Sequence, residues 1–363
     1  MRVERIGLAE WESALPDTGT EVFHRPEALE VLDRHFDGEL IPLAGYKGDR
    51  VVGLFPAFVT ERAVGRAVLS PPPGMAVPRL GPVLNPASPK RRKRERLNRE
   101  FTTAVLDAVH PNQTVGDALA SIGINGVPEP FDGVSTTATL FRVVCNAAYG
   151  DPRPFAWDDF TLEPQFTYRL ALDGREADDL LDGFSRSLRR EIRSGEELDV
   201  AVHREGVDGL RAVYEHTRRR YEEQDEALGL GWKYVHDLWT ALDERARVYV
   251  ARENDIYRGG IVVLYSDDTA YFWLGGNRVD VDGVSVNSVL HWRIIRDLIE
   301  DPPNESIDGY DLVGANTERI SRYKAKFGAD LVPYYVIESN GVGISVAKRA
   351  YDLARKLDVS GAP

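Results

Sequence analysis

Three short apolar runs in the second half of the chain constrain the fold more than any other feature. They read RVYVARE at 247–253, GGIVVLYS at 259–266 and TAYFWLGG at 269–276. Each has the length and the β-branched and aromatic content of a strand, and short polar turns separate them. Segment 286–300 follows, with apolar residues at helical spacing. The sequence therefore predicts a three-stranded meander followed by an amphipathic helix.

The rest of the chain alternates between helical and strand patterns. The other segments predicted as helices are 21–36 (after Pro26), 90–109, 176–195, 206–224, 233–246 and 316–328. The other predicted strands lie within 39–62, 134–144, 166–173, 198–205, 307–314 and 330–339, and a Pro/Gly-rich loop spans 69–89. At 363 residues the chain is too long for one ordinary core. We expect an α/β (α+β) protein of two related halves, 1–165 and 166–363, each a mixed, mostly antiparallel sheet flanked by helices.

Charge and composition narrow the class of protein. The net charge of −13 argues against a general affinity for nucleic acid or anionic membranes. Eight lysines stand against 37 arginines, and this acidic, lysine-poor composition suits a halophilic source. The N-terminus has no apolar signal segment, and no apolar run reaches the roughly 18 residues that span a bilayer. We expect a cytoplasmic protein without a membrane span. The one cysteine, Cys145, lies in an apolar run and is expected to be a buried structural thiol.

The usual signatures of metal sites and covalent nucleophiles are missing from the sequence. The seven histidines are scattered, without His-x-x-x-His spacing, and there is no Cys-x-x-Cys pair. Gly-x-Ser-x-Gly and Walker loops are also absent. His291 lies beside Trp292 on a mostly apolar helix, which favours a structural role. We therefore expect neither a metal centre nor a covalent serine mechanism.

Arginines recur on one side of the predicted helix within 184–200, at positions 186, 189, 190 and 193. Ser185 is a candidate N-cap for that segment. The arginines could form surface ion pairs with glutamates at 191, 196 and 197. Alternatively they could clamp a polyanion, because guanidinium groups bind phosphate and carboxylate in a bidentate way. A second basic run, at 90–99, could likewise be a solvated helix face or a surface that binds a phosphate-rich partner.

The segment Arg-Tyr-Lys-Ala-Lys-Phe-Gly, 322–328, carries two of the eight lysines. Helical spacing predicts that Ile320, Tyr323 and Phe327 pack inward and that Gly328 ends the helix. Lys324 would then lie at the edge of the buried side. It could be an ordinary surface lysine with a buried stem. It could also place an ammonium group where an anion or a developing oxyanion binds.

Three motifs, in order, resemble the FemAB/FemX-like acyltransferases of the GNAT superfamily. The first is Phe-Ser-x-x-x-Arg-Arg-x-Ile-Arg, at 184–193. The second is Asn-x-x-Leu-x-Trp, at 287–292, after the meander. The third is Tyr-Lys-x-x-Phe-Gly, at 323–328, after a strand that carries Asp311. The resemblance covers most of residues 40–335.

This resemblance implies two tandem GNAT-like domains and the transfer of an acyl or aminoacyl group to an amine by direct attack, with the oxyanion stabilised in a cleft between the domains or within the C-terminal one. The family's lysine stabilises charge on the transferred carbonyl, and Lys324 matches it. Asp311 would be a base or would orient Lys324. Candidate substrate-binding residues are Arg186, Arg190, Asn287, Tyr323 and Asn277.

One part of the chain departs from the GNAT pattern. Acetyltransferases of that superfamily bind the coenzyme A pyrophosphate with a glycine-rich loop before the helix that follows the meander. Here the sequence reads NRVDVDGVSVNS, where Gly283 is alone and Asp280 and Asp282 would repel a pyrophosphate. Acyl-CoA and aminoacyl-tRNA both remain open as donor, as do the amine acceptor and the oligomeric state. The alternatives are an inactive binding protein for a nucleotide sugar or polar head group, and an RNA-associated protein that uses residues 90–99.

Overall fold

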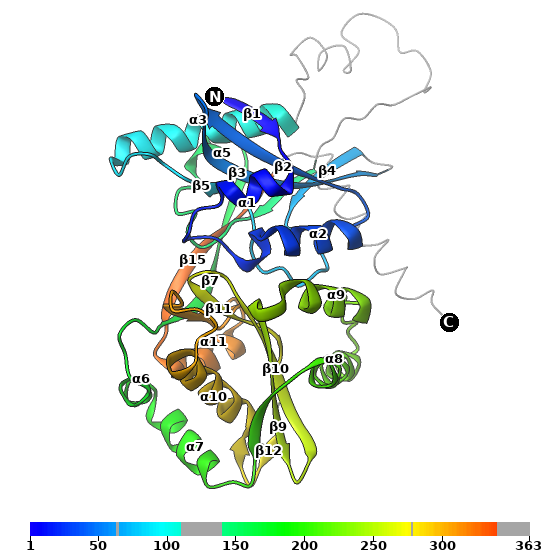
Figure 1. Ribbon diagram of the computed structural model, residues 1–363, viewed down its shortest axis with the longest axis vertical. Coiled ribbons are helices and arrows are strands. Elements are labelled where there is room, and N and C mark those ends of the chain that lie inside the picture. The colour runs from blue at the N-terminus through cyan, green and yellow to red at the C-terminus, as the bar shows by residue number, and fades with distance from the viewer. Residues whose placement is uncertain (63–64, 110–139, 277–278, 340–363) are drawn as a thin grey trace, which may run out of the picture.

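The computed structural model describes residues 1–62, 65–109, 140–276 and 279–339 (Figure 1). Predictions that concern 134–139 and Asn277 lie outside these residues. The strands of the first half are β1 Arg2–Arg5, β2 Glu39–Lys47, β3 Arg50–Arg62, β4 Gly65–Ser70, β5 Val83–Leu84 and β6 Leu140–Val144. Those of the second half are β7 Thr161–Ala171, β8 Ala201–Glu205, β9 Ala246–Glu253, β10 Ile256–Tyr265, β11 Thr269–Gly275, β12 Asp280–Val281, β13 Val284–Ser285, β14 Gly309–Asp311 and β15 Asp330–Glu338.

The strands of both halves belong to one mixed sheet. Among the described residues its order is β1-β2-β3-β4-β6-β15-β7-β14-β11-β10-β9-β8, with β5 paired to β3 and β12–β13 forming a separate hairpin. The last strand, β15, links the halves because it pairs antiparallel with both β6 and β7. The proposed division at residue 165 falls within β7 and stays a prediction.

Helices cover both faces of this sheet. Those of the first half are α1 Leu8–Ala14, η1 Val22–His24, α2 Pro26–His35, α3 Arg91–Val109 and α5 Arg153–Ala156. Those of the second half are α6 Ala177–Gly183, α7 Arg186–Glu196, α8 Val207–Glu222, α9 Trp232–Leu242, η2 Asp243–Arg245, α10 Val286–Glu300, α11 Glu318–Lys324 and η3 Ala325–Phe327. One apolar core runs beneath α1, α2, α8 and α9 and joins the two halves. On the opposite face, α3 packs on the first half and α6, α7 and α10 pack on the second.

The halves share one structural unit. In each, two neighbouring parallel strands are connected by a chain segment that contains a long helix: β4 and β6 by the segment with α3, and β11 and β14 by the segment with α10. Figure 1 shows α3 in the upper half and α10 in the lower half. This repetition agrees with the expectation of two related halves.

Most of the predicted elements are present. The meander is β9–β10–β11, and α10 has the predicted bounds of 286–300. Cys145 is buried, and burial raises the pKa of its thiol, as a structural role requires. Gly328 ends the predicted helix with φ of 63°.

Two local predictions were wrong. Segment 176–195 forms two helices because Phe184 is extended and Ser185 caps a new helix, accepting a hydrogen bond from the Leu188 N–H. Ile320 does not pack inward, and 38% of it is exposed. The buried side of α11 is formed by Lys324, with Tyr323 beside it, and Phe327 follows in η3.

Candidate active site

The pairing of β11 and β14 ends abruptly at the candidate site. The two parallel strands stay in register as far as Tyr271 and Asp311. After Asp311 the chain remains with β7, because the Leu312 N–H donates to the Tyr168 carbonyl at 2.9 Å. Strand β11 instead continues along β10 to Gly275. The sheet therefore divides between residues 272–275 and residues 312–315.

Strand β11 is also irregular at this point. Its register with β10 shifts so that Val262 faces Leu274 and Val263 faces Phe272. Trp273 is the extra residue of this bulge, and bulges re-aim backbone and side chains and often lie near functional sites. The Trp273 indole N–H donates to the Ala76 carbonyl at 2.9 Å, which ties the bulge to the loop of the first half.

Lys324 places its ammonium group where the sheet divides. Its side chain donates to the carbonyl of Val313 and, at 3.0 Å, to that of Gly314. Its Nζ lies 5.5 Å from the centre of the Phe272 ring, within reach of a cation–π interaction. An ammonium has three N–H groups, so one is left for another acceptor.

Burial makes this lysine unusual. Only 6% of Lys324 is exposed, and burial lowers its pKa to about 8, although the nearby carboxylate of Asp311 opposes the shift. Desolvation disfavours the charged form, whereas the acid and the two carbonyl groups favour it. The lysine is therefore neither a surface residue nor permanently charged.

Aromatic and polar side chains of α10 and α11 surround this position. The Asn287 amide donates to the Tyr323 hydroxyl at 3.0 Å, and burial raises the pKa of Tyr323 to about 12. His291 is fully buried and its Nδ1 lies 2.9 Å from the Tyr310 hydroxyl. Burial, followed by the charge of Lys324, lowers the pKa of His291 to about 3, so its ring is neutral. Among the described residues, Asn287 Oδ1 and His291 Nε2 have no hydrogen-bond partner.

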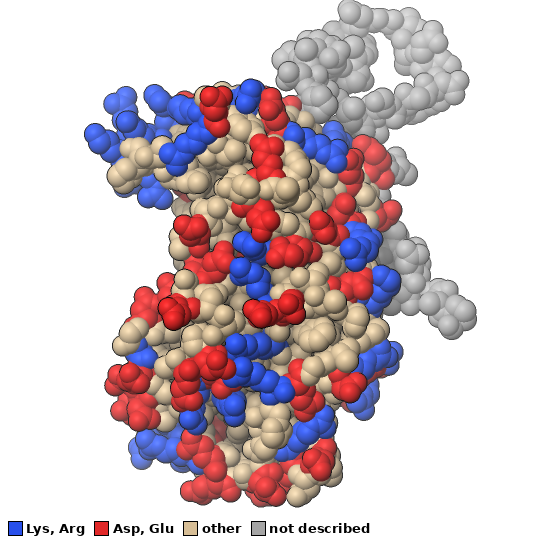
Figure 2. Space-filling model, viewed as in Figure 1, with Lys and Arg blue, Asp and Glu red and all other residues tan. Residues whose placement is uncertain are grey.

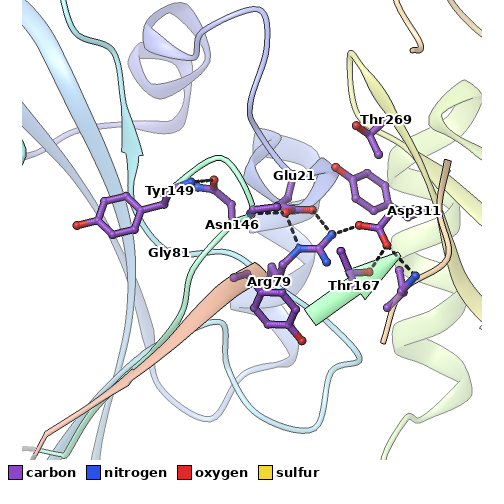
Figure 3. Close-up of polar contacts among 12 residues, drawn as sticks. Glu21, Arg79, Gly81, Asn146, Tyr149, Thr167, Thr269 and Asp311 are labelled. Carbon is purple, nitrogen blue, oxygen red and sulfur yellow. Dashed lines mark hydrogen bonds and ion pairs between the residues drawn. The ribbon is translucent and has the colours of Figure 1, made fainter. Parts of the chain in front are cut away.

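Asp311 belongs to a buried network that crosses between the halves (Figure 3). Arg79 Nη2 lies 2.5 Å from Asp311, and Arg79 Nε lies 2.8 Å from Glu21. The other Asp311 oxygen accepts from the Thr167 hydroxyl and, at 2.7 Å, from the Val313 N–H. Both oxygens of this carboxylate are thus engaged. This arrangement fits a residue that positions the Val313 carbonyl and Lys324 better than it fits a free base.

Arg79 is the functional candidate that sequence reasoning missed. It is only 1% exposed, although it lies in the Pro/Gly-rich loop, where arginines are usually solvated. Burial by itself would lower the pKa of Arg79, but the carboxylates of Asp311 and Glu21 raise it well above its usual value. Its partners lie 58 and 232 residues away in the sequence, so no local pattern reveals them.

A carboxylate already occupies the start of α10. The Ser285 N–H donates to Glu191 at 3.3 Å, and the Ser288 hydroxyl donates to the same carboxylate at 3.1 Å. This is the helix start at which a GNAT acetyltransferase would hold a pyrophosphate. The hairpin β12–β13 precedes it and carries Asp280 and Asp282. The carboxylates of Glu191, Asp280 and Asp282 agree with the departure from the GNAT pyrophosphate-binding loop that the sequence shows.

The predicted arginine cluster lies on the outer face of α7, where Arg186, Arg190 and Arg193 are exposed. It lines a hollow of about 400 Å³, together with Ser194 and Glu197. Within the described part of the chain, Arg186, Arg190 and Arg193 form no ion pair, while Arg189 pairs with Asp182 at 3.5 Å. Two of the three glutamates predicted to pair with them have other partners: Glu191 accepts from Ser285 and Ser288, and Glu196 accepts from the Trp292 indole N–H.

In the residues that the structure describes, no group of three His, Cys, Asp or Glu side chains could hold a metal ion. None of the helices in those same ranges is long and apolar enough to cross a membrane.

Comparisons with known proteins support the fold and match one domain in the second half of the chain. Residues 182–325 match the family model of the acetyltransferase (GNAT) domain. No curated protein matches the sequence. Among solved structures, FemX is similar with a TM-score of 0.62 and 12% identity, over 92% of this chain and 97% of FemX.

Two further structures show the same fold over nearly full length. The C-terminal domain of a proposed lysylphosphatidylglycerol synthetase from Agrobacterium fabrum has a TM-score of 0.51 and 12% identity, with 94% of each chain covered. L-PGS from Bacillus licheniformis has a TM-score of 0.51 and 11% identity, over 94% of this chain and 95% of that protein. At such identities these likenesses show the fold. The second half of the chain therefore carries a match to the acetyltransferase (GNAT) domain, and the whole chain has a fold similar to that of FemX.

Proposed function

We propose that the protein transfers an acyl or aminoacyl group from an activated ester or thioester to an amine, with Lys324 stabilising the charge that forms on the transferred carbonyl. The observation that carries the proposal is the buried Lys324 ammonium at the division between β11 and β14. A preorganised donor in a site of low dielectric stabilises an oxyanion far more than it would in water.

The reaction requires no covalent enzyme intermediate. The neutral amine attacks the carbonyl carbon, a C–N bond forms, and negative charge develops on the carbonyl oxygen, which accepts a hydrogen bond from Lys324. The C–O or C–S bond to the carrier then breaks, and the amine proton passes to the leaving group or to water. The chain's contribution is alignment and electrostatic stabilisation. Asp311 acts as a positioning residue through Val313.

The neighbouring residues suit the binding of a polar group. Asn287 Oδ1 and His291 Nε2 are buried without partners in the described structure, and unsatisfied buried polar atoms are costly unless a ligand or water pairs with them. Tyr323 holds the Asn287 amide in place. Asn287 and Tyr323 are therefore assigned to the acyl or amine group, and Arg186 and Arg190, on the outer face of α7, to an anionic carrier. Asn277, which lies outside the described residues, is also proposed to bind substrate.

A donor screen tests this function. The full chain is incubated with acetyl-CoA or with aminoacyl-tRNA and a panel of primary amines, and products are detected by mass spectrometry. Formation of an amide that depends on protein and on one donor class supports the proposal. Tight binding of a donor or acceptor without any turnover would instead support a binding protein that has lost catalysis.

A further inference from the structure

A large cavity in the first half has no part in the proposed transfer site. Its volume is about 850 Å³, within the range of roughly 300–1,000 Å³ that small-molecule sites occupy. It lies between the first turns of α3, the segment around β5 and residues 146–153. Arginines of the basic run 90–99, to which the proposed function assigns no role, line this cavity.

One wall of the cavity is cationic. Arg91, Arg94 and Arg153 line it. Glu95 draws two of these together, since it lies 3.1 Å from Arg91 and 2.8 Å from Arg153. Asp151 holds Arg153 at 2.7 Å, whereas Arg94 is exposed and forms no ion pair among the described residues. This wall of the cavity therefore contains three guanidinium groups and two carboxylates, so its net charge is positive.

The position of these cations is electrostatically unfavourable for the protein alone. Helix α3 begins at Arg91, and its first turn contains basic residues and no acid. Cations near the positive end of a helix are electrostatically destabilising. Figure 2 shows Lys and Arg side chains gathered over this end of α3, at the upper left. An anion in the cavity would offset that repulsion.

The other wall is apolar, and the floor is rigid. Pro82, Leu84 and Leu97 contribute to the apolar wall. In the floor, the buried Tyr149 hydroxyl donates to Asn98 at 2.8 Å, and the Asn146 amide donates to the Pro82 carbonyl at 2.6 Å. Buried side chains locked by such bonds give a preformed shape.

The equivalent place in the second half is closed to anions. Helix α10 occupies the same position in its strand–helix–strand unit as α3 does, but the carboxylate of Glu191 covers its start. In the first half, the start of α3 opens beside the arginine-lined cavity. Of these two strand–helix–strand units, only the first therefore has a helix start that is accessible to an anion.

We propose that this cavity binds a small organic phosphate, with the phosphate held by Arg94 beside Arg91 and Arg153 and the organic part on the apolar wall. Guanidinium groups bind phosphate in a bidentate, charge-assisted way. A long nucleic acid is disfavoured by the net charge of −13 and by the acids within the cavity wall. This site goes beyond the transfer site at Lys324 and does not depend on it.

The test is isothermal titration calorimetry of the full chain with phenyl phosphate and with inorganic phosphate, at low ionic strength. Phenyl phosphate should bind several-fold more tightly, because the ring buries apolar surface. Arg94→Gln should weaken binding about tenfold, the loss of one charge-assisted contact. Arg96→Gln is the matched control, since Arg96 is exposed on the same helix and does not line the cavity. It should change the affinity less than about twofold.

Several results would overturn the proposal. One is that neither phosphate binds at millimolar concentration. Another is that Arg94→Gln and Arg96→Gln weaken phosphate binding equally. A third is that the protein binds a short single-stranded RNA and not phenyl phosphate. Unchanged melting temperatures show that the variants remain folded. Lys324→Met should bind phenyl phosphate as the wild type does, so that failure of the transfer mechanism and failure of this site are distinguishable.

Discussion

Arg79 and Asp311 form a buried ion pair, with 2.5 Å between Nη2 and Oδ2, that connects the loop of the first half to β14 of the second. The same guanidinium binds Glu21 at 2.8 Å. Val313 connects this pair to Lys324, because its N–H donates to Asp311 and its carbonyl accepts from Lys324. The ion pair between the halves thus positions the Val313 backbone, and Val313 in turn positions Lys324.

Arg79→Met should destabilise the protein by about 3–5 kcal/mol, because it leaves two buried carboxylates without their cation. Denaturant unfolding measures the change. Arg296→Met, which removes an exposed ion pair with Glu300 at 3.0 Å, is the control and should cost less than about 1 kcal/mol. Neutralising both acids in Glu21→Gln/Asp311→Asn should reduce the effect of Arg79→Met. Equal losses in Arg79→Met and the control would show that the network does not stabilise the junction.

Gly275→Ala tests the backbone beside the site. Gly275 has φ of 107°, and a Cβ there would lie 2.3 Å from the Gly260 carbonyl oxygen. The variant should lose more than about 3 kcal/mol from strain and overlap together. Gly48→Ala separates the two causes, because Gly48 has φ of 64° and no heavy atom within 4 Å of the added Cβ. It should lose only about 1 kcal/mol. A similar cost at both glycines would contradict the close approach of β10 and β11.

The pH dependence of stability tests the burial of Lys324. Its folded-state pKa is about 8, below the ordinary lysine value of 10.5 that applies when the chain is unfolded. Between these values the unfolded chain binds more protons, so the free energy of unfolding rises with pH there. Lys324→Met lacks this dependence. The stability of the wild type relative to Lys324→Met should therefore increase by up to about 3 kcal/mol from pH 8 to 10.5, and be flat below pH 7. A constant difference across that range would mean that the lysine is solvated.

Much of the fold was predictable because its elements have strong local patterns. The apolar stripe of 286–300 predicts α10, and the short turns between the three apolar runs predict the meander β9–β10–β11. Ile320 was misplaced because a helix as short as α11 has too few residues to define its buried side, and tertiary contacts placed Lys324 there instead. The break at Ser185 was half predicted, as a cap but not as the start of a separate helix.

The site was predictable only in part. Lys324, Asp311, Asn287 and Tyr323 lie on elements that meet where β11 and β14 part, and their roles there stay predictions. Arg79 and Glu21 carry no motif, and their role comes from contacts between residues far apart in the sequence. The same is true of Glu191, whose acceptance of the Ser285 N–H reflects the packing of α7 on α10.

The most direct measurement of the central claim is kcat/KM for acyl transfer by wild type, Lys324→Met and Lys326→Met, with the donor that the screen identifies. Loss of one oxyanion donor should lower kcat about 100-fold or more in Lys324→Met. Lys326, which is half-buried two residues further along and lies over the Tyr323 ring, should tolerate the same change with little loss. Wild-type kcat in a folded Lys324→Met variant would contradict the account.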